Sequence, residues 1–149
     1  MRYPSDTFGL IPLHMPSDKG KRFGRVVELG KAPVHANWTA RPYNSDKVRK
    51  AALDSGRNVG VRLTDEQLVV DVDPRNGGNE GWAALCHDLG IDESAYPCVV
   101  TGSDGLHFYM SKPAGVLVRD TLESDSYSGV EFKSAGRQVV AAGSIHPNG

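Results

Sequence analysis

Two carboxylates of this 149-residue chain interrupt an apolar run, and a third lies in a similar run further along. Asp71 and Asp73 alternate with valine at the end of Leu68–Asp73, and Glu131 divides a Val-Glu-Phe segment. An acid inside an apolar run is costly to bury unless it is paired or binds a ligand. Acids two residues apart on a strand share one face, with Cα atoms roughly 6.5 Å apart. Their oxygens suit Mg²⁺ or Mn²⁺.

A histidine and a lysine fall on the same predicted face. His107 alternates with the apolar residues of Leu106–Met110, and Lys133 has the parity of Glu131 in Val130–Lys133. If the apolar positions of these strands line one core, the acids, His107 and Lys133 project together from the opposite face of one sheet. Two metal ions held there could activate an attacking oxygen and stabilise a leaving one in phosphoryl transfer.

A structural interpretation of the same residues stays open. Asp71 and Asp73 could be turn-forming residues that end a strand before Pro74, which is the commoner role of a lone D-x-D. The position of Asp71 inside the apolar run favours function instead. His107, taken alone, is equally well explained as a hydrogen-bonded histidine of a sheet.

Short elements punctuated by glycine and proline must position these residues. A strand is predicted over Phe8–Leu13, at a sheet edge because Pro12 cannot donate to a ladder. A helix capped by Ser45 or Asp46 is predicted to end at Gly56, and another, capped by Asn79, is predicted to end at Gly90. The second helix has apolar positions at Trp82, Leu85, Cys86 and Leu89.

The remaining runs read as strands joined by turns. A strand is predicted over Arg22–Leu29, and three hairpins pair 58–63 with 67–73, 98–101 with 106–110, and 129–133 with 137–142. Residues 112–128 are predicted to be an irregular, mobile connection. These elements predict an α+β fold with a mixed, largely antiparallel sheet and helices on one face. The chain is expected to be one domain, 1–149, with a basic module at 1–57 and a metal-binding palm at 58–149.

The composition of the chain limits the classes of protein to which it could belong. Hydrophobic residues make up 39% and charged residues 23% of the chain, which is typical of a globular domain. No apolar run is long enough to cross a bilayer, and the residues after Met1 are not expected to act as a secretory signal. Cys86 and Cys98 form no disulfide framework, so a cytoplasmic protein with reduced thiols is expected.

Positive charge is concentrated near the beginning of the chain. Residues 1–50 carry ten Lys/Arg against four Asp/Glu, whereas residues 51–100 carry three against nine. A basic surface for a polyanion beside an acidic site for cations would explain this, and so would two differently solvated faces. The candidates for tracking a nucleic-acid backbone are Lys19, Lys21, Arg22, Arg25, Lys31, Arg41, Arg49 and Lys50. Trp38 and Tyr43 could stack on bases, although Trp38 is equally well a core residue.

Three segments resemble, in order and spacing, the signatures of the archaeo-eukaryotic primase superfamily. The first signature resembles Leu68-Val-Val-Asp-Val-Asp-Pro-Arg-Asn-Gly-Gly78, and the second is similar to Thr101-Gly-Ser-Asp-Gly-Leu-His-Phe-Tyr109. The third is similar to Gly129-Val-Glu-Phe-Lys133 with the trailing segment Gly136–Gly149. The most similar branch is the bifunctional DNA primase/polymerase (prim-pol) N-terminal domain of phage and plasmid replication proteins.

The resemblance implies an RRM-like palm that carries a template-directed nucleotidyltransferase. Asp71, Asp73 and Glu131 would hold two Mg²⁺ or Mn²⁺ ions, although the family usually has aspartate where Glu131 stands. The triphosphate of an incoming NTP or dNTP would contact His107, and the resemblance gives nucleotide contacts to Ser103, Lys133, Ser144 and His146 as well. Glycine is more usual where Asp104 stands.

The resemblance also implies partners and a cellular setting. Single-stranded or primed DNA would be the template, and among the basic candidates named above, Lys21, Arg22 and Lys31 are expected to bind it. A fused or associated helicase, a longer replication protein and a bacterial or phage-infected cytoplasm are typical of the family; no membrane partner is expected. Two other functions stay open: another D-x-D metal enzyme, either a sugar-nucleotide transferase or a phosphodiesterase, and a non-catalytic module that binds single-stranded nucleic acid.

Overall fold

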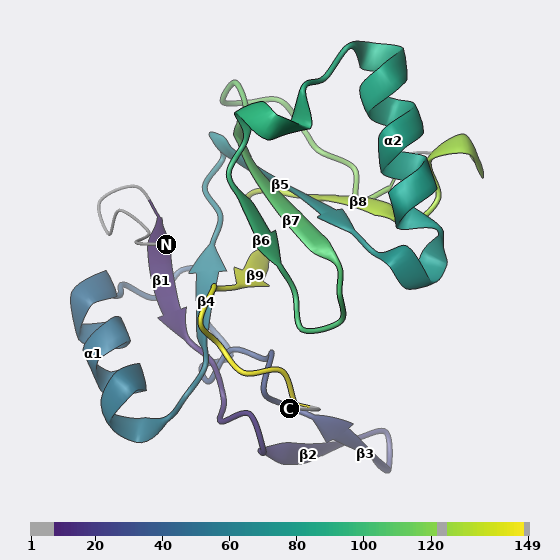
Figure 1. Cartoon of the computed structure of the whole chain (residues 1–149). Helices are drawn as coiled ribbons and strands as arrows, with labels where there is room; N and C mark the ends of the chain where they lie inside the picture. The colour runs from purple at the N-terminus through teal and green to yellow at the C-terminus, as the bar shows by residue number, and fades with distance from the viewer. Residues whose placement is uncertain (1–7, 122–124, 148–149) are drawn as a thin grey trace. The chain divides into compact units, whose positions relative to one another are not determined.

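The chain folds into two units, each with its own antiparallel sheet (Figure 1). The computed structural model describes residues 8–121 and 125–147. The first unit comprises Met1–Arg62 together with Gly136–Gly149, and the second unit comprises Leu63–Ala135. The expectations on the first residues after Met1 and on the last two residues of the third signature therefore lie outside the described residues.

The first unit has a three-stranded antiparallel sheet covered by one helix. Strands β1 (Gly9–Pro12), β4 (Val59–Arg62) and β9 (Gln138–Val140) lie in the order β1-β4-β9. Pro12 is thus on an edge strand, as predicted. Helix α1 (Ser45–Ser55) is capped by Asn44 and not by Ser45 or Asp46, and it ends before Gly56, whose φ of 74° suits glycine.

A separate two-stranded ribbon belongs to the same unit. Strand β2 (Lys19–Arg22) pairs with β3 (Arg25–Glu28), and Phe23 and Gly24 form the turn between them. The prediction of one strand over Arg22–Leu29 is therefore wrong. The chain reverses direction at Phe23-Gly24, where both residues have positive φ.

The second unit has a four-stranded antiparallel sheet and the second helix. Strands β5 (Gln67–Val72), β6 (Cys98–Val100), β7 (Leu106–Ser111) and β8 (Val130–Lys133) lie in the order β6-β7-β5-β8. Helix α2 (Gly78–Leu89) connects β5 to β6, and three 3₁₀ turns are present: η1 (Pro74–Asn76), η2 (Glu93–Ala95) and η3 (Asp125–Tyr127). The α+β class with largely antiparallel sheets is confirmed. The finer comparison with an RRM-like palm stays a prediction.

Apolar residues of one strand parity form the core of the second unit. Val70, Val72, Phe108 and Val130 pack with Trp82 and Leu85 of α2. The rings of Trp82 and Phe108 stack with their centroids 5.0 Å apart. Two details of the predicted helix are wrong: Leu89 is 66% exposed, and the helix is capped by Gly77 rather than by Asn79.

Two of the three predicted hairpins are wrong. The pair 98–101 with 106–110 is observed as β6 and β7, but β4 pairs with β1 and β9, whereas β5 pairs with β7 and β8. Residues 64–66 do turn, with the amide of Gln67 donating to the carbonyl of Thr64, but the strands that they connect enter different sheets. The Ser134 hydroxyl donates to the carbonyl of Gln67 (2.7 Å), so the segments by which the chain enters and leaves the second unit lie side by side.

The boundaries between the two units differ from the expected one. A basic module at 1–57 and a palm at 58–149 were expected, with the boundary next to Asn58. Because β4 and β9 pair with one another, the boundaries fall instead at 62/63 and at 135/136.

Between residues 112 and 121 the regular pairing is limited to an isolated bridge, from Thr121 to Glu131. Neither α1 nor α2, the α-helices of the described residues, has the length and apolar content needed to cross a membrane.

Candidate active site

Asp71, His107 and Glu131 form one row across three neighbouring strands of the second unit. In the register of the sheet, Asp71 of β5 is directly opposite His107 of β7 and directly opposite Glu131 of β8. Directly opposite residues in an antiparallel sheet share a face. The common face predicted for these three residues is therefore observed, and it is opposite the core face that carries Val70 and Val72.

Side chains from the two neighbouring strands, His107 and Lys133, contact the Asp71 carboxylate. His107 Nε2 lies 3.4 Å from Asp71 Oδ1, and Lys133 Nζ lies 3.7 Å from Asp71 Oδ2. The same Lys133 Nζ is 2.9 Å from Glu131 Oε2, so one ammonium bridges the two carboxylates. Lys133 and His107 are largely buried, with side chains 13% and 10% exposed, which keeps water from screening these contacts.

The balance of these contacts keeps Asp71 ionised. Burial by itself raises the pKa of Asp71. The hydrogen bond and charge of His107, with the charge of Lys133, outweigh burial, and the pKa of Asp71 lies below its usual value. Asp73 is near enough that its negative charge opposes this shift. Asp71 is therefore an anion at neutral pH and able to accept hydrogen bonds or bind a cation.

Asp73 has a different local role. It follows the end of β5, where its Oδ1 accepts hydrogen bonds from the amide and Nε of Arg75, both at 3.0 Å. Its Oδ2 accepts from Arg75 Nη2 (3.0 Å) and from Asn76 Nδ2 (3.1 Å). These hydrogen bonds, that from the Arg75 side chain above all, hold the pKa of Asp73 below its usual value. The turn-forming interpretation thus describes Asp73, while Asp71 lies inside the strand.

Among the described residues, one nitrogen of His107 has no hydrogen-bond partner. Its Nδ1 is buried and accepts or donates no hydrogen bond within the described part of the chain. An unsatisfied buried polar atom costs roughly 1–3 kcal/mol, so its presence marks a site that a ligand could complete. Val69 and Tyr109, which have the same strand parity as Asp71 and His107, are also buried.

The turn that leads into His107 is tied together by Thr101. Its Oγ1 accepts a hydrogen bond from the amide of Gly105 (3.0 Å) and lies 3.4 Å from the hydroxyl of Ser103. Asp104 has a φ of 60°, a conformation that glycine adopts most readily. This explains why glycine would suit the position. Ser103 is half-buried in the same turn, just before the strand that carries His107.

The other predicted site residues belong to the first unit. Ser144 Oγ donates to the carbonyl of Val59 (3.2 Å) and accepts from its amide (3.1 Å), and Ser144 lines a pocket of about 360 Å³ beside α1. His146 lies two residues further on and is half-buried. Ser144 and His146 are thus part of a different unit from the row that contains Asp71.

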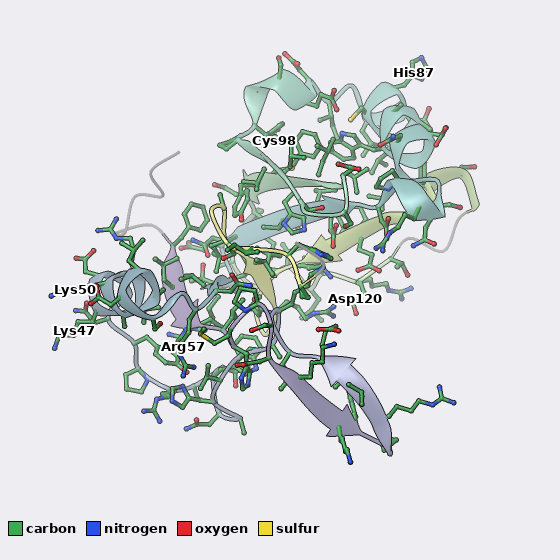
Figure 2. All side chains as sticks on the ribbon, turned by 60° about the horizontal axis from the view of Figure 1, so that its bottom comes forward. Lys47, Lys50, Arg57, His87, Cys98 and Asp120 are labelled. Atoms are coloured by element: carbon green, nitrogen blue, oxygen red, sulfur yellow. The ribbon has the colours of Figure 1, made fainter. Side chains whose placement is uncertain are left out.

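The basic candidates are exposed on the first unit. Lys21 and Arg22 lie on β2, and Lys31 follows the ribbon, with its carbonyl accepting from Gln138 Nε2 (2.9 Å). Figure 2 shows Lys50, with its neighbour Lys47, pointing outward from α1. Tyr43 is less accessible, because its hydroxyl bonds to His35 Nδ1 (2.9 Å) and the Arg62 guanidinium covers its ring at 5.3 Å.

The donor set fits a hard divalent cation in its chemistry. Asp71, Asp73 and Glu131 offer carboxylate oxygens, which Mg²⁺ and Mn²⁺ prefer. In the described residues, however, no three His, Cys, Asp or Glu side chains are gathered into a metal-binding group. Lys133 neutralises Asp71 and Glu131, and Arg75 neutralises Asp73. Binding of a cation would therefore displace these contacts.

The roles of Arg75 and Thr101 were not predicted from the sequence. The signal for Arg75 was the segment Asp-Pro-Arg-Asn, in which an aspartate before proline caps a short turn and bonds the amide two residues on. The signal for Thr101 was its position at the start of a Gly-Ser-Asp-Gly turn, where a threonine hydroxyl commonly bonds to backbone.

Comparison with known protein families gives a match over the full length of the sequence. The family described as "Bifunctional DNA primase/polymerase, N-terminal" matches residues 1–149, the whole chain. No curated protein matches the chain.

Proposed function

Because the chain belongs to the bifunctional DNA primase/polymerase N-terminal family, we propose that it is a nucleotidyltransferase that extends a primer or a first nucleotide on a DNA template. Family membership supports DNA and nucleotides as the substrates. The observation that carries the proposal is the row Asp71–His107–Glu131 with the Lys133 ammonium beside it. A helicase partner stays an expectation from the resemblance.

Asp71, Asp73 and Glu131 are the residues proposed to hold Mg²⁺ or Mn²⁺. When bound, such ions lower the pKa of an attacking hydroxyl and neutralise charge on the transferred and leaving phosphates. Asp71 would meet the cation as an anion, since its pKa lies below the usual value. Asp73 would exchange its hydrogen bonds with Arg75 for this role.

The remaining residues are proposed to bind and orient the nucleotide. Lys133, once released from Asp71 and Glu131, would place a positive charge next to phosphate oxygens. The unpartnered Nδ1 of His107 would donate a hydrogen bond to a phosphate oxygen of the triphosphate, which would relieve the cost of its burial. Ser103, in the turn before His107, would offer a hydroxyl to the same phosphates. Ser144 and His146 stay proposed nucleotide contacts.

A primer-extension assay tests this function. The expected result is that the wild-type chain extends a labelled primer with dNTPs or NTPs in Mg²⁺ or Mn²⁺, and that Asp71→Asn lowers the rate at least 100-fold because it removes an anionic oxygen ligand. Glu80→Gln, at an exposed position of α2, is the matched control and should retain full activity. Thermal unfolding of both variants shows whether the fold is intact.

Three outcomes would count against the proposal. Full activity of Asp71→Asn would contradict the metal assignment. Turnover of a UDP-sugar, or cleavage of labelled DNA without synthesis, would indicate one of the other D-x-D enzymes. Tight binding of single-stranded DNA with no incorporation in either metal would indicate a non-catalytic module.

A further inference from the structure

The tip of the β2–β3 ribbon presents an aromatic side chain in an unusual backbone conformation. Phe23 is 94% exposed and has a φ of 49°, and the following Gly24 has a φ of 75°. Two positive φ values define a type I′ turn, for which asparagine followed by glycine is the favoured sequence. A bulky residue at the first position is disfavoured by local sterics. Asparagine at position 23 would therefore stabilise this turn better than phenylalanine does.

Positive charge is concentrated at the same turn. Arg22 and Arg25 are directly opposite one another and close the turn, and the Arg22 guanidinium lies 5.6 Å from the centre of the Phe23 ring. Like charges directly opposite across a ribbon destabilise it. Lys21 adds a third cation next to Arg22, whereas the one acid of the ribbon, Glu28, pairs with Lys19 at the far end (3.5 Å).

The ribbon is also a two-stranded sheet of its own. Strands β2 and β3 pair with each other and, among the described residues, with no third strand. Figure 1 shows them as a ribbon apart from the β1-β4-β9 sheet of the same unit, and Figure 2 shows long side chains that end in nitrogen reaching away from it. The tip thus combines an exposed aromatic face with a pair of facing arginines, and residues 21–26 include no acid.

We propose that the ribbon tip binds single-stranded nucleic acid, with a base stacked on Phe23 and a backbone phosphate between Arg22 and Arg25. A base supplies a flat aromatic partner for the ring, and the adjoining phosphate supplies the anion that relieves repulsion between the arginines. The choice of a nucleic-acid strand rests on the proposed function, which it deepens by assigning a contact for the template or primer strand. An anionic membrane surface would satisfy the arginines, but it offers no flat partner for the ring.

Strand binding by the whole chain, measured without nucleotides and with metal chelated, tests this contact separately from catalysis. Fluorescence anisotropy with a labelled oligothymidylate reports affinity. Phe23→Asn creates the favoured Asn-Gly turn, so its melting temperature should equal or exceed that of the wild type, while its affinity should fall about tenfold. Phe23→Trp keeps an aromatic face and should bind at least as tightly as the wild type. Leu117→Asn, which changes another exposed apolar residue, in the second unit, should leave affinity unchanged.

The arginine pair is tested by the dependence of affinity on salt. Arg22→Gln with Arg25→Gln should weaken binding and reduce the slope of log affinity against log salt by about 0.7 for each phosphate that the pair no longer neutralises. Unchanged affinity of Phe23→Asn, equally weak binding by Phe23→Trp and Phe23→Asn, or wild-type binding to vesicles of anionic lipid but not to the oligonucleotide would each overturn the inference. Primer extension by the wild-type chain decides the proposed function independently of these results.

Discussion

At the scale of single residues, the ionisation of Asp71 depends on neighbours from two other strands. His107 is across the ladder on β7, and Lys133 comes from β8, two residues beyond Glu131. A partly buried carboxylate without such partners would be protonated more easily. The depressed pKa of Asp71 is therefore a property of the assembled sheet and not of the Asp-Val-Asp segment.

Replacing Lys133 should weaken this effect measurably. Lys133→Met removes a positive charge that lowers the pKa of Asp71, so the pKa of Asp71 should rise toward its usual value. A carboxyl-carbon NMR titration measures this shift. Because the folded-state pKa is depressed, Asp71 contributes stability above the unfolded value of 3.8 that is lost as pH falls through the folded pKa. The loss of stability that Lys133→Met causes through Asp71 should therefore be present at pH 7 and disappear at strongly acidic pH.

A second lysine supplies the control for this titration. Lys112 pairs with Asp65 at 3.0 Å, and the pKa of Asp65 is lowered first by the amide of Gly115 and then by Lys112. Lys112→Met should raise the pKa of Asp65 and leave that of Asp71 unchanged. An Asp71 titration that is the same in wild type and Lys133→Met would show that Lys133 does not act on Asp71.

The row of site residues could be predicted from the sequence because strand side chains alternate with period two. Parity alone places Asp71, His107 and Glu131 on one face once their strands share a sheet. The contacts of Asp73 could not be predicted in the same way, because they depend on the backbone leaving the strand at Pro74. The alternation of side chains identifies a shared face only for residues within a strand.

At the scale of elements, the start of α2 is packed against the loop that follows β5. The amide of Gly78 donates to the carbonyl of Asp73 (2.9 Å), and the amide of Asp73 donates to the carbonyl of Gly129 (2.8 Å). A Cβ at Gly78 would lie 2.5 Å from the Asp73 carbonyl oxygen, and a Cβ at Gly81 would clash with the carbonyl of Ser128. These glycines let the helix approach the backbone that carries Asp73.

Helix propensity and packing therefore make opposite predictions for Gly81→Ala. Alanine favours a helix over glycine by about 1 kcal/mol, but the added methyl meets rigid backbone, which costs more. We expect Gly81→Ala to lower the free energy of unfolding by about 2 kcal/mol in urea denaturation. Asn79→Ala, at an exposed position of the same turn, should be neutral or slightly stabilising, since Asn79 does not cap the helix. The reverse order of stabilities would show that Asn79 is the cap.

The two wrong hairpin predictions have one physical cause. Local turn chemistry identifies where the chain turns, as at 64–66, but strand pairing is decided by which sheet buries each strand. Val61 of β4 and Val70 of β5 are both fully buried valines of short β-rich runs. The local sequence therefore does not indicate that their strands belong to different sheets. The β6–β7 hairpin was predictable because its two strands do pair directly across a short turn.

At the scale of the whole molecule, the two units have opposite charge. The first unit has thirteen Lys/Arg against five Asp/Glu, and the second has four against thirteen. Division of the sequence into thirds understates this contrast, because residues 51–62 and 136–149 belong with the basic unit and residues 101–135 with the acidic one. Each unit by itself thus suits a different ligand: a polyanion for the first and cations for the second.

Because each unit has its own sheet, we expect each unit to open, and to lose protection of its amides from hydrogen exchange, independently of the other. Val61 and Val70 are matched probes, since each is a fully buried valine in the central part of its unit's sheet. Truncation to alanine should cost about 2 kcal/mol at either site. If the units open independently, Val61→Ala should speed amide hydrogen exchange roughly 30-fold in β1, β4 and β9, and Val70→Ala should do so in β5, β7 and β8. Exchange read by mass spectrometry of peptides from each unit distinguishes this from a single cooperative core, in which either variant would speed exchange in both units equally.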